Sequence, residues 1–241
     1  MKKIIIYFSI ITALTLGSCS KMLETTPRNA VDLTQATTSL DALQGVLIAI
    51  YNQLQGSAYY GRDFVVIPEL IADNAEITAQ NSNRFVQQAN NSPRAHQGIW
   101  ATAYSGIFRC NFILKYIDGV TADEATKKQI KGEAFFLRAL MYHDLVRTYA
   151  RNPRFLVNNF DLGVPIILEP VTDVTAVTYP NRSKVTEVYA QIVSDLNSAV
   201  SLFPNGGSRY KGNKAAALGL LSRVHLYLGN WAEAEAKATE C

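Results

Sequence analysis

An apolar stripe with helical spacing within residues 122–149 limits the fold more than any other feature. Ile130, Ala134, Leu137, Met141 and Leu145 recur every three or four positions, which places them on one face of an amphipathic helix. Similar stripes predict helices over residues 39–55 and 98–117, and others that begin near Val185, after Asn213 and at Trp231. Strand-like alternation is nowhere sustained enough for a sheet-based domain. The sequence therefore predicts an all-α fold.

Two helix starts carry a capping-box pattern. Thr38 precedes Asp41 by three residues, and Thr121 precedes Glu124 by three. Pro68 is typical of a first helical turn and predicts a short helix from there to about residue 75.

Two long segments lack such patterns. Residues 79–98 are rich in Asn, Gln and Ser and contain little that could be buried, so they predict a long loop. Residues 150–182 contain four prolines and predict an irregular crossover between helices. Loops of this length in a compact domain are usually functional or disordered.

The last forty residues have the pattern of a tetratricopeptide unit. Leu221 and Tyr227 fall in its first helix, Gly229 in the tight turn, and Trp231 and Ala234 in its second helix. Helix pairs of this kind need neighbours to cover their outer faces. Because this repeat begins near residue 213 and the sequence stops at residue 241, we expect the chain to be an incomplete helical-repeat region.

The first residues predict a lipoprotein signal peptide. Lys2 and Lys3 precede an apolar run, Ile4–Leu16, that is too short to span a bilayer comfortably, and Gly17-Ser18-Cys19 follows it. Small residues before a cysteine match the bacterial lipobox, in which acyl chains are attached to that cysteine. We expect residues 1–18 to be the signal peptide, 19–37 a lipidated tether, and 38–241 the helical region. The alternatives are an ordinary signal peptide with an incidental cysteine, or an uncleaved anchor.

Composition excludes several classes of protein. Removing residues 1–18 takes away two lysines and no acid, so the net charge falls from +3 to +1, which gives no electrostatic argument for nucleic-acid binding. Two remaining cysteines, Cys110 and Cys241, make no disulfide framework. Since 48% of residues are hydrophobic, we expect a fold held by packing.

The chemistry-bearing residues do not predict an enzyme. His96, His143 and His225 lack metal-ligand spacing, so we expect no metal, no cofactor other than the lipid on Cys19, and no catalytic residue. Cys110 lies on an apolar helix face and is expected to be an inert, buried thiol. Residues 207–214 look superficially like a phosphate-binding loop, but a helix precedes them and Asn213 replaces the required lysine. We interpret them as a helix-capping turn.

Charged pairs on the helices are interpreted as surface pairs. Glu133 with Arg138, and Asp144 with Arg147, are close enough in sequence to meet on one helix surface. Trp100 and the tyrosine four residues after it are interpreted as core residues rather than as a ligand platform.

A series of short motifs occurs in a fixed order through the sequence. The motifs are Ser18-Cys19-Ser20, Leu23 to Pro27, Ala49-Ile50-Tyr51-Asn52, Ala72-Asp73-Asn74, Trp100-x-x-x-Tyr104-x-x-Ile107-x-x-x-Asn111, Lys131-Gly132-Glu133-Ala134-x-x-Leu137-Arg138-Ala139, Gly163-Val164-Pro165, Asp195-Leu196, Asn213-Lys214-Ala215-Ala216 and Leu226-Tyr227-Leu228-Gly229-Asn230-Trp231. In this order they resemble the SusD/RagB family of outer-membrane nutrient-binding lipoproteins. One departure is Ala150 after Tyr149, where the family usually has glycine. Family chains are also about twice as long, so the sequence resembles an N-terminal portion.

The resemblance implies a SusD-like helical-repeat fold and a non-enzymatic function. It implies a protein lipid-anchored to the outer membrane and exposed at the cell surface. Such a protein binds oligosaccharides or other nutrients and delivers them to a SusC-like TonB-dependent transporter. The alternative is a helical-repeat lipoprotein scaffold that binds protein or peptide partners and no glycan. A glycan-active enzyme would need two carboxylates flanking a cleft, and the sequence offers no such pair.

Ligand-binding candidates lie outside the predicted helices. Sugars are bound by aromatic faces together with amide and guanidinium groups, and exposed loops on a rigid scaffold commonly carry binding. An ordinary solvated polar loop is the alternative for each residue. The candidates are Tyr59 and Tyr60 in one turn, and Asn81, Asn83, Arg84 and Phe85 in the long loop.

Overall fold

The computed structural model describes residues 37–92, 98–157, 160–173, 175 and 177–241, and within these ranges the regular structure is helical. The predicted signal peptide, Cys19 and all but the last residue of the predicted tether lie outside the described residues, as does His96. The elements are α3 (Leu40–Leu54), α4 (Asp63–Ile71), α5 (Val86–Ala89), α6 (Ile99–Tyr116), the 3-10 helix η2 (Ile117–Gly119), α7 (Glu124–Tyr149), α8 (Val185–Leu202), α9 (Lys214–Leu228) and α10 (Trp231–Glu240).

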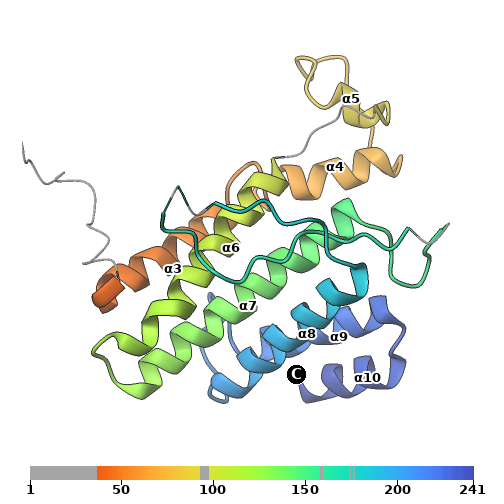
Figure 1. Ribbon diagram of the computed structural model, residues 1–241. Coiled ribbons are helices and arrows are strands. Elements are labelled where there is room, and N and C mark those ends of the chain that lie inside the picture. Colours follow the sequence, from red (N-terminus) through yellow and green to blue (C-terminus); the bar gives the residue numbers. More distant parts are fainter. Residues whose placement is uncertain (1–36, 93–97, 158–159, 174, 176) are drawn as a thin grey trace, which may run out of the picture. The chain divides into compact units, whose positions relative to one another are not determined.

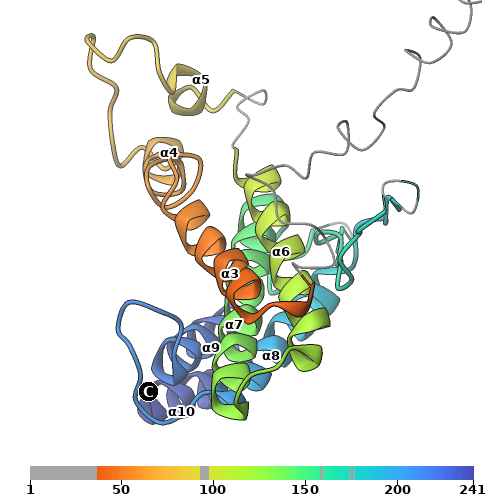
Figure 2. The same ribbon diagram turned by 90° about the vertical axis from the view of Figure 1, so that its left-hand side faces the viewer.

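Helix α7 lies at the centre of the helical stack. It packs against α6 on one side and α8 on the other, and α3 also contacts it (Figure 1). Helix α9 packs on α8, and α10 on α9, while α3 lies along α6 (Figure 2). The predicted all-α class is therefore confirmed for the part of the chain that the structure describes.

The central position of α7 makes it more buried than its sequence pattern predicts. Six consecutive residues, Met141–Val146, are all buried, although only two of them belong to the predicted apolar stripe. A helix covered on several faces must bury polar side chains too, and here these include His143 and Asp144. The amphipathic stripe therefore identified the helix and missed how completely it is enclosed.

The two predicted capping boxes are wrong in position. Helix α3 is capped by Ser39, whose hydroxyl accepts the backbone N–H three residues on, whereas Thr38 has helical backbone and lies one position before the cap. Helix α7 is capped by Asp123, whose carboxylate accepts the N–H of Thr126 at 2.8 Å, and Thr121 lies outside the helix. Both true caps are side chains in extended backbone geometry, which is what a cap requires.

Pro68 lies inside α4 and does not begin it. The helix starts five residues earlier, at Asp63, after a tight turn that needs Gly61, where an added Cβ would come within 2.2 Å of the carbonyl oxygen of Gln55. Pro68 removes the hydrogen bond that its N–H would have made to the carbonyl of Phe64, while its fixed φ is compatible with helical backbone. The prediction of a helix from Pro68 to residue 75 is corrected accordingly.

The carboxyl-terminal helix pair matches its prediction. Asn213 caps α9 by accepting the N–H of Ala216 at 2.8 Å, and α9 ends at Gly229 with φ +78°. Ala234 of α10 is buried, and its carbonyl oxygen accepts a hydrogen bond from Ser222 of α9 at 2.7 Å. A small residue at position 234 lets the two helices approach closely, as in a tetratricopeptide unit.

The described residues of the crossover, 150–157, 160–173, 175 and 177–182, are irregular, as predicted, and Leu162 forms an isolated bridge with Lys184. Across the described ranges, no helix is both long enough and apolar enough to cross a membrane.

Candidate functional site

Residues 73–92, called here the excursion, leave the helical stack after α4 and include the short α5 (Figures 1 and 2). Every non-glycine residue with positive φ in the described ranges lies in it, at Asp73, Ser82, Asn83, Phe85 and Asn91. Left-handed backbone costs an L-residue roughly 1–2 kcal/mol, least for Asn and Asp. Such strain clusters at ligand-binding segments, so the excursion is the first candidate site.

Phe85 and the polar groups near it form the surface of the excursion. The Arg62 guanidinium lies 5.4 Å from the centre of the Phe85 ring, and the Arg62 Nε donates to the carboxylate of Asp63 at 2.7 Å. Asn83 and Arg84 are exposed, and Phe85 is half-buried. The structure therefore places the Arg62 guanidinium against the Phe85 ring, with Asn83 and Arg84 exposed at the two preceding positions of the chain. Aromatic, guanidinium and amide groups are suitable chemistry for sugar hydroxyls and C–H faces.

Asn81 has a local structural role in this group. Its side-chain amide donates to the carbonyl oxygen of Arg84, and the Arg84 Nε donates back to the carbonyl oxygen of Asn81 at 3.3 Å. This reciprocal pair fixes the turn that holds Asn83. A cavity of about 390 Å³ lies elsewhere in the excursion, where the end of α4, α5 and the segment between them meet. Its lining includes Leu70, Asp73, Glu76, Ile77, Val86 and Asn90.

Tyr59 was predicted to bind ligand, but it lies in the core and not on a ligand surface. Its ring is fully buried and stacks on Phe64 at 5.4 Å with 9° between the planes, while the edge of Tyr60 covers it at 4.8 Å. The hydroxyl of Tyr59 donates to Asp144 at 2.9 Å, and the hydroxyl of the half-buried Tyr60 donates to the same carboxylate. The two tyrosines therefore fasten the turn before α4 to the central helix.

Asp144 and Arg147 are not a surface pair. Asp144 is 1% exposed, and it accepts hydrogen bonds from two tyrosines and from the Nη2 of Arg147 at 2.7 Å. Burial raises the pKa of the Asp144 carboxyl, against the hydrogen bonds that favour its charged form. This cluster supports the segment from which α4 and the excursion depart.

Arg138 pairs with a distant acid and not with Glu133. Its Nε and Nη2 donate to the two oxygens of Asp195 on α8 at 2.8 and 2.7 Å, and its Nη1 donates to Asn111 on α6 at 2.8 Å. Arg138 is 6% exposed and Asp195 1%. Arg138, predicted to lie at the surface, therefore forms a buried, bidentate ion pair between α7 and α8, and its bond to Asn111 adds α6.

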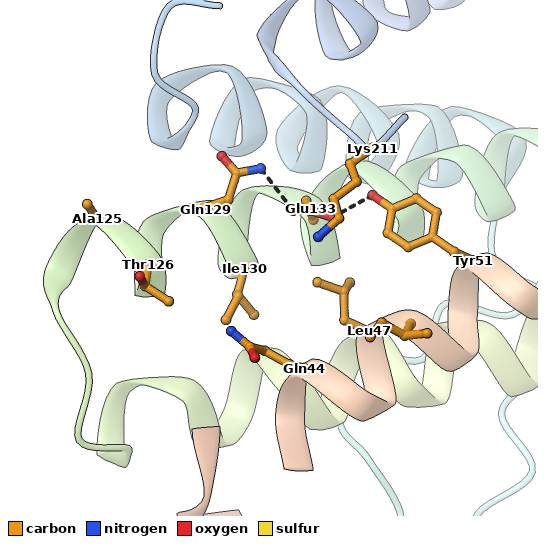
Figure 3. Close-up of a pocket in the computed structure, with 10 residues that line it drawn as sticks. Gln44, Leu47, Tyr51, Ala125, Thr126, Gln129, Ile130, Glu133 and Lys211 are labelled. Carbon is orange, nitrogen blue, oxygen red and sulfur yellow. Dashed lines mark hydrogen bonds between the residues drawn. The ribbon is translucent and has the colours of Figure 1, made fainter. Parts of the chain in front are cut away.

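A second cavity lies between α3 and the first half of α7, and is called here the α3–α7 pocket (Figure 3). Its volume is about 370 Å³. Glu133 is buried in its wall and accepts hydrogen bonds from the Tyr51 hydroxyl at 2.7 Å and the Gln129 amide at 2.9 Å. The Tyr51 hydroxyl in turn accepts the N–H of Gly212 at 2.7 Å. The lining residues are Gln44, Leu47, Ile48 and Tyr51 from α3, Ala125, Thr126, Gln129, Ile130 and Glu133 from α7, and Lys211.

The remaining candidates take structural roles. Trp100 is 39% exposed and packs on Tyr104 and Tyr149 with ring centres 5.0 Å apart, so it is only partly the core residue that was expected. Cys110 is fully buried, and burial raises its pKa well above the ordinary value. His143 is also fully buried, with neither ring nitrogen bonded to a described residue. The described residues contain no group of three or more His, Cys, Asp or Glu placed to hold a metal ion.

Comparison with known proteins identifies the class to which this arrangement belongs. Residues 21–226 match a SusD-like family model described as starch-binding and associating with the outer membrane. The chain therefore belongs to the SusD-like family. SusD-like protein P2 of Formosa agariphila is 26% identical over 99% of this chain and 46% of its own length.

Solved structures share the fold. A SusD superfamily protein from Bacteroides thetaiotaomicron is 30% identical with a TM-score of 0.71, over 84% of this chain and 46% of that chain. A SusD-like carbohydrate-binding protein from Bacteroides vulgatus is 26% identical with a TM-score of 0.66, over 84% of this chain and 44% of that chain. The chain thus spans about half the length of the relatives it matches.

Proposed function

We propose that this chain is the helical portion of a non-enzymatic, surface-exposed lipoprotein that binds oligosaccharides for a TonB-dependent outer-membrane transporter. The excursion would supply its ligand contacts, through Asn83, Arg84 and Phe85. The observation that carries this proposal is the clustering of left-handed, non-glycine backbone in that one segment. Strain of this kind persists only where the surroundings hold it, and binding surfaces are a common place for it.

The contacts around the excursion favour a rigid base for the proposed ligand surface. The Asp144 cluster fastens the turn before α4, and the Arg62 guanidinium covers one side of the Phe85 ring. A ligand-binding group held by a packed scaffold loses less conformational entropy on binding. Family membership and the carbohydrate binding named for the Bacteroides vulgatus relative support a glycan as the ligand.

The test is glycan binding by the purified chain, measured by affinity electrophoresis and titration calorimetry with starch, maltoheptaose and laminarin. Asn83→Ala, Arg84→Ala and Phe85→Ala should each weaken binding by at least fivefold. Tyr179→Ala is a matched control, because that ring is 92% exposed on the crossover, far in sequence from the excursion. Equal losses in the control, or full binding by all three excursion variants, would contradict the proposal. Co-purification of a protein partner without any glycan retardation would favour the peptide-binding scaffold instead.

The lipid anchor is a separate part of the proposal. Acyl chains on Cys19 would hold the protein at the outer membrane beside its transporter, since each buried CH₂ contributes about 0.8 kcal/mol. Cys19→Ala should move the chain from the membrane fraction to the soluble fraction and remove the lipid mass from the protein. Retention of the variant on membranes at the level of the unmodified sequence would refute the anchor.

A further inference from the structure

Glu133 is a buried carboxylate without a positively charged partner in the described ranges. It is 2% exposed, yet its two hydrogen bonds come from neutral groups, the hydroxyl of Tyr51 and the amide of Gln129. The ion pairs of α7 join other residues to Glu124, Asp118, Asp195 and Asp144. Buried carboxylates are normally paired, because removing an unpaired charge from water is costly.

The carboxylate has unused bonding capacity beside an open space. An ionised carboxylate offers about four lone-pair sites, and two of those on Glu133 are occupied. Glu133 lines the α3–α7 pocket, so a group inside the pocket can approach it (Figure 3). The volume of about 370 Å³ is in the range of small-ligand sites.

The remaining lining selects the kind of molecule that fits. Leu47, Ile48 and Ile130 provide an apolar wall, and Gln44, whose amide makes no hydrogen bond to a described residue, provides a donor and an acceptor. Lys211 reaches in from the connection between α8 and α9, and its ammonium forms no ion pair with any described carboxylate (Figure 3). A carbon-rich body complements the apolar wall, and a positive, hydrogen-bond-donating group on it complements Glu133 but is repelled by Lys211.

From this geometry we propose that the α3–α7 pocket binds a primary ammonium group carried on a compact ligand, with Glu133 as its counter-charge. An amino sugar and a lysine side chain both present this chemistry. A charge-assisted hydrogen bond to Glu133 would use its free lone pairs, while the stem of the ligand would contact the apolar wall. The pocket is separate in sequence from the excursion, so this inference does not depend on glycan binding there.

Two matched ligand pairs test the proposal with the intact chain. Glucosamine and N-acetylglucosamine differ in the charge of one nitrogen, and Nα-acetyl-lysine amide and Nα-acetyl-norleucine amide differ in the presence of the ammonium group. Saturation-transfer NMR and calorimetry at low ionic strength should show at least about tenfold tighter binding of the charged member in one pair. The pair that shows the preference identifies the source of the ammonium. Equal binding within both pairs would overturn the inference.

Variants of the chain assign the effect to the pocket. Glu133→Gln should abolish the preference for the charged ligand, whereas Glu124→Gln, the same change on an exposed residue of the same helix outside the pocket lining, should not. Because Glu133→Gln could also disturb the network with Tyr51, Lys211→Ala and Lys211→Glu provide an independent test on an exposed side chain. Removing or reversing this like charge should tighten ammonium binding two- to fivefold. Weaker or unchanged binding in both Lys211 variants would refute the proposal.

Discussion

The buried His143 makes the stability of this protein depend on pH in a way that one substitution should remove. Its ring is fully buried between Tyr189 of α8 and Tyr227 of α9, with ring centres 6.1 and 5.2 Å away. Burial, with smaller contributions from the positive charges of Arg147 and Arg223, lowers the pKa of His143 from 6.5 to about 3. His143 is therefore neutral in the folded protein at every pH above about 4.

The sign of the effect follows from proton binding. Between pH 3 and pH 6.5 the unfolded chain protonates this histidine and the folded chain does not, so stability is complete above pH 6.5 and is lost as the pH falls. The loss between pH 7.5 and pH 5 is about 2 kcal/mol, and the full shift corresponds to about 5 kcal/mol below pH 3. Burial of two unbonded ring nitrogens adds a cost at all pH values.

Urea unfolding, followed by far-UV circular dichroism and tryptophan fluorescence, measures this contribution. The quantity compared is the free energy of unfolding of His143→Leu minus that of the unmodified chain. We expect this difference to rise by about 2 kcal/mol as the pH is lowered from 7.5 to 5, because only the unmodified chain loses the contribution of His143. Taking the difference cancels the pH dependence that comes from carboxyl groups such as Asp144, which are present in both proteins. His225→Gln is the control, because this histidine is only half-buried, so partial burial lowers its pKa. A constant difference between the two proteins over this pH range would refute the reasoning.

Two further predictions concern buried groups. Asp195→Asn should lower the free energy of unfolding by about 3–5 kcal/mol, because it leaves the Arg138 guanidinium buried without a counter-charge, whereas Asp118→Asn at an exposed ion pair should cost less than about 1 kcal/mol. Similar losses in the two variants by urea unfolding would contradict the assignment. Cys110 should resist iodoacetamide in the native chain while the exposed Cys241 reacts, because burial raises the pKa of Cys110 and closes off its sulfur. Peptide mapping by mass spectrometry checks this, and native labelling of Cys110 at the rate of Cys241 would contradict it.

The positions of most helices could be predicted from the sequence because helix formation depends on short-range periodicity. The stripes predicted α3, α6, α7, α8, α9 and α10, and the Asn213 cap and the small Ala234 were assigned correctly. The caps of α3 and α7 were misplaced by one and two residues, because several neighbouring polar side chains could serve and the backbone geometry selects among them. The part of the excursion from residue 79 onward was predicted as a loop from its composition, although the short α5 forms within it, and its backbone strain has no sequence signal.

The sequence by itself determined the helical class, the tetratricopeptide-like final pair and the resemblance that membership of the SusD-like family confirmed. Only the tertiary structure decided which polar side chains are buried. Arg138 meets Asp195 across 57 positions, and Tyr59 meets Asp144 across 85, so no local pattern on α7 could reveal either partner. The same holds for Glu133, whose pocket forms only where α3, α7 and the segment before α9 converge. Helical periodicity is a property of neighbours in the chain, whereas the environment of a charge is set by whatever the fold brings against it.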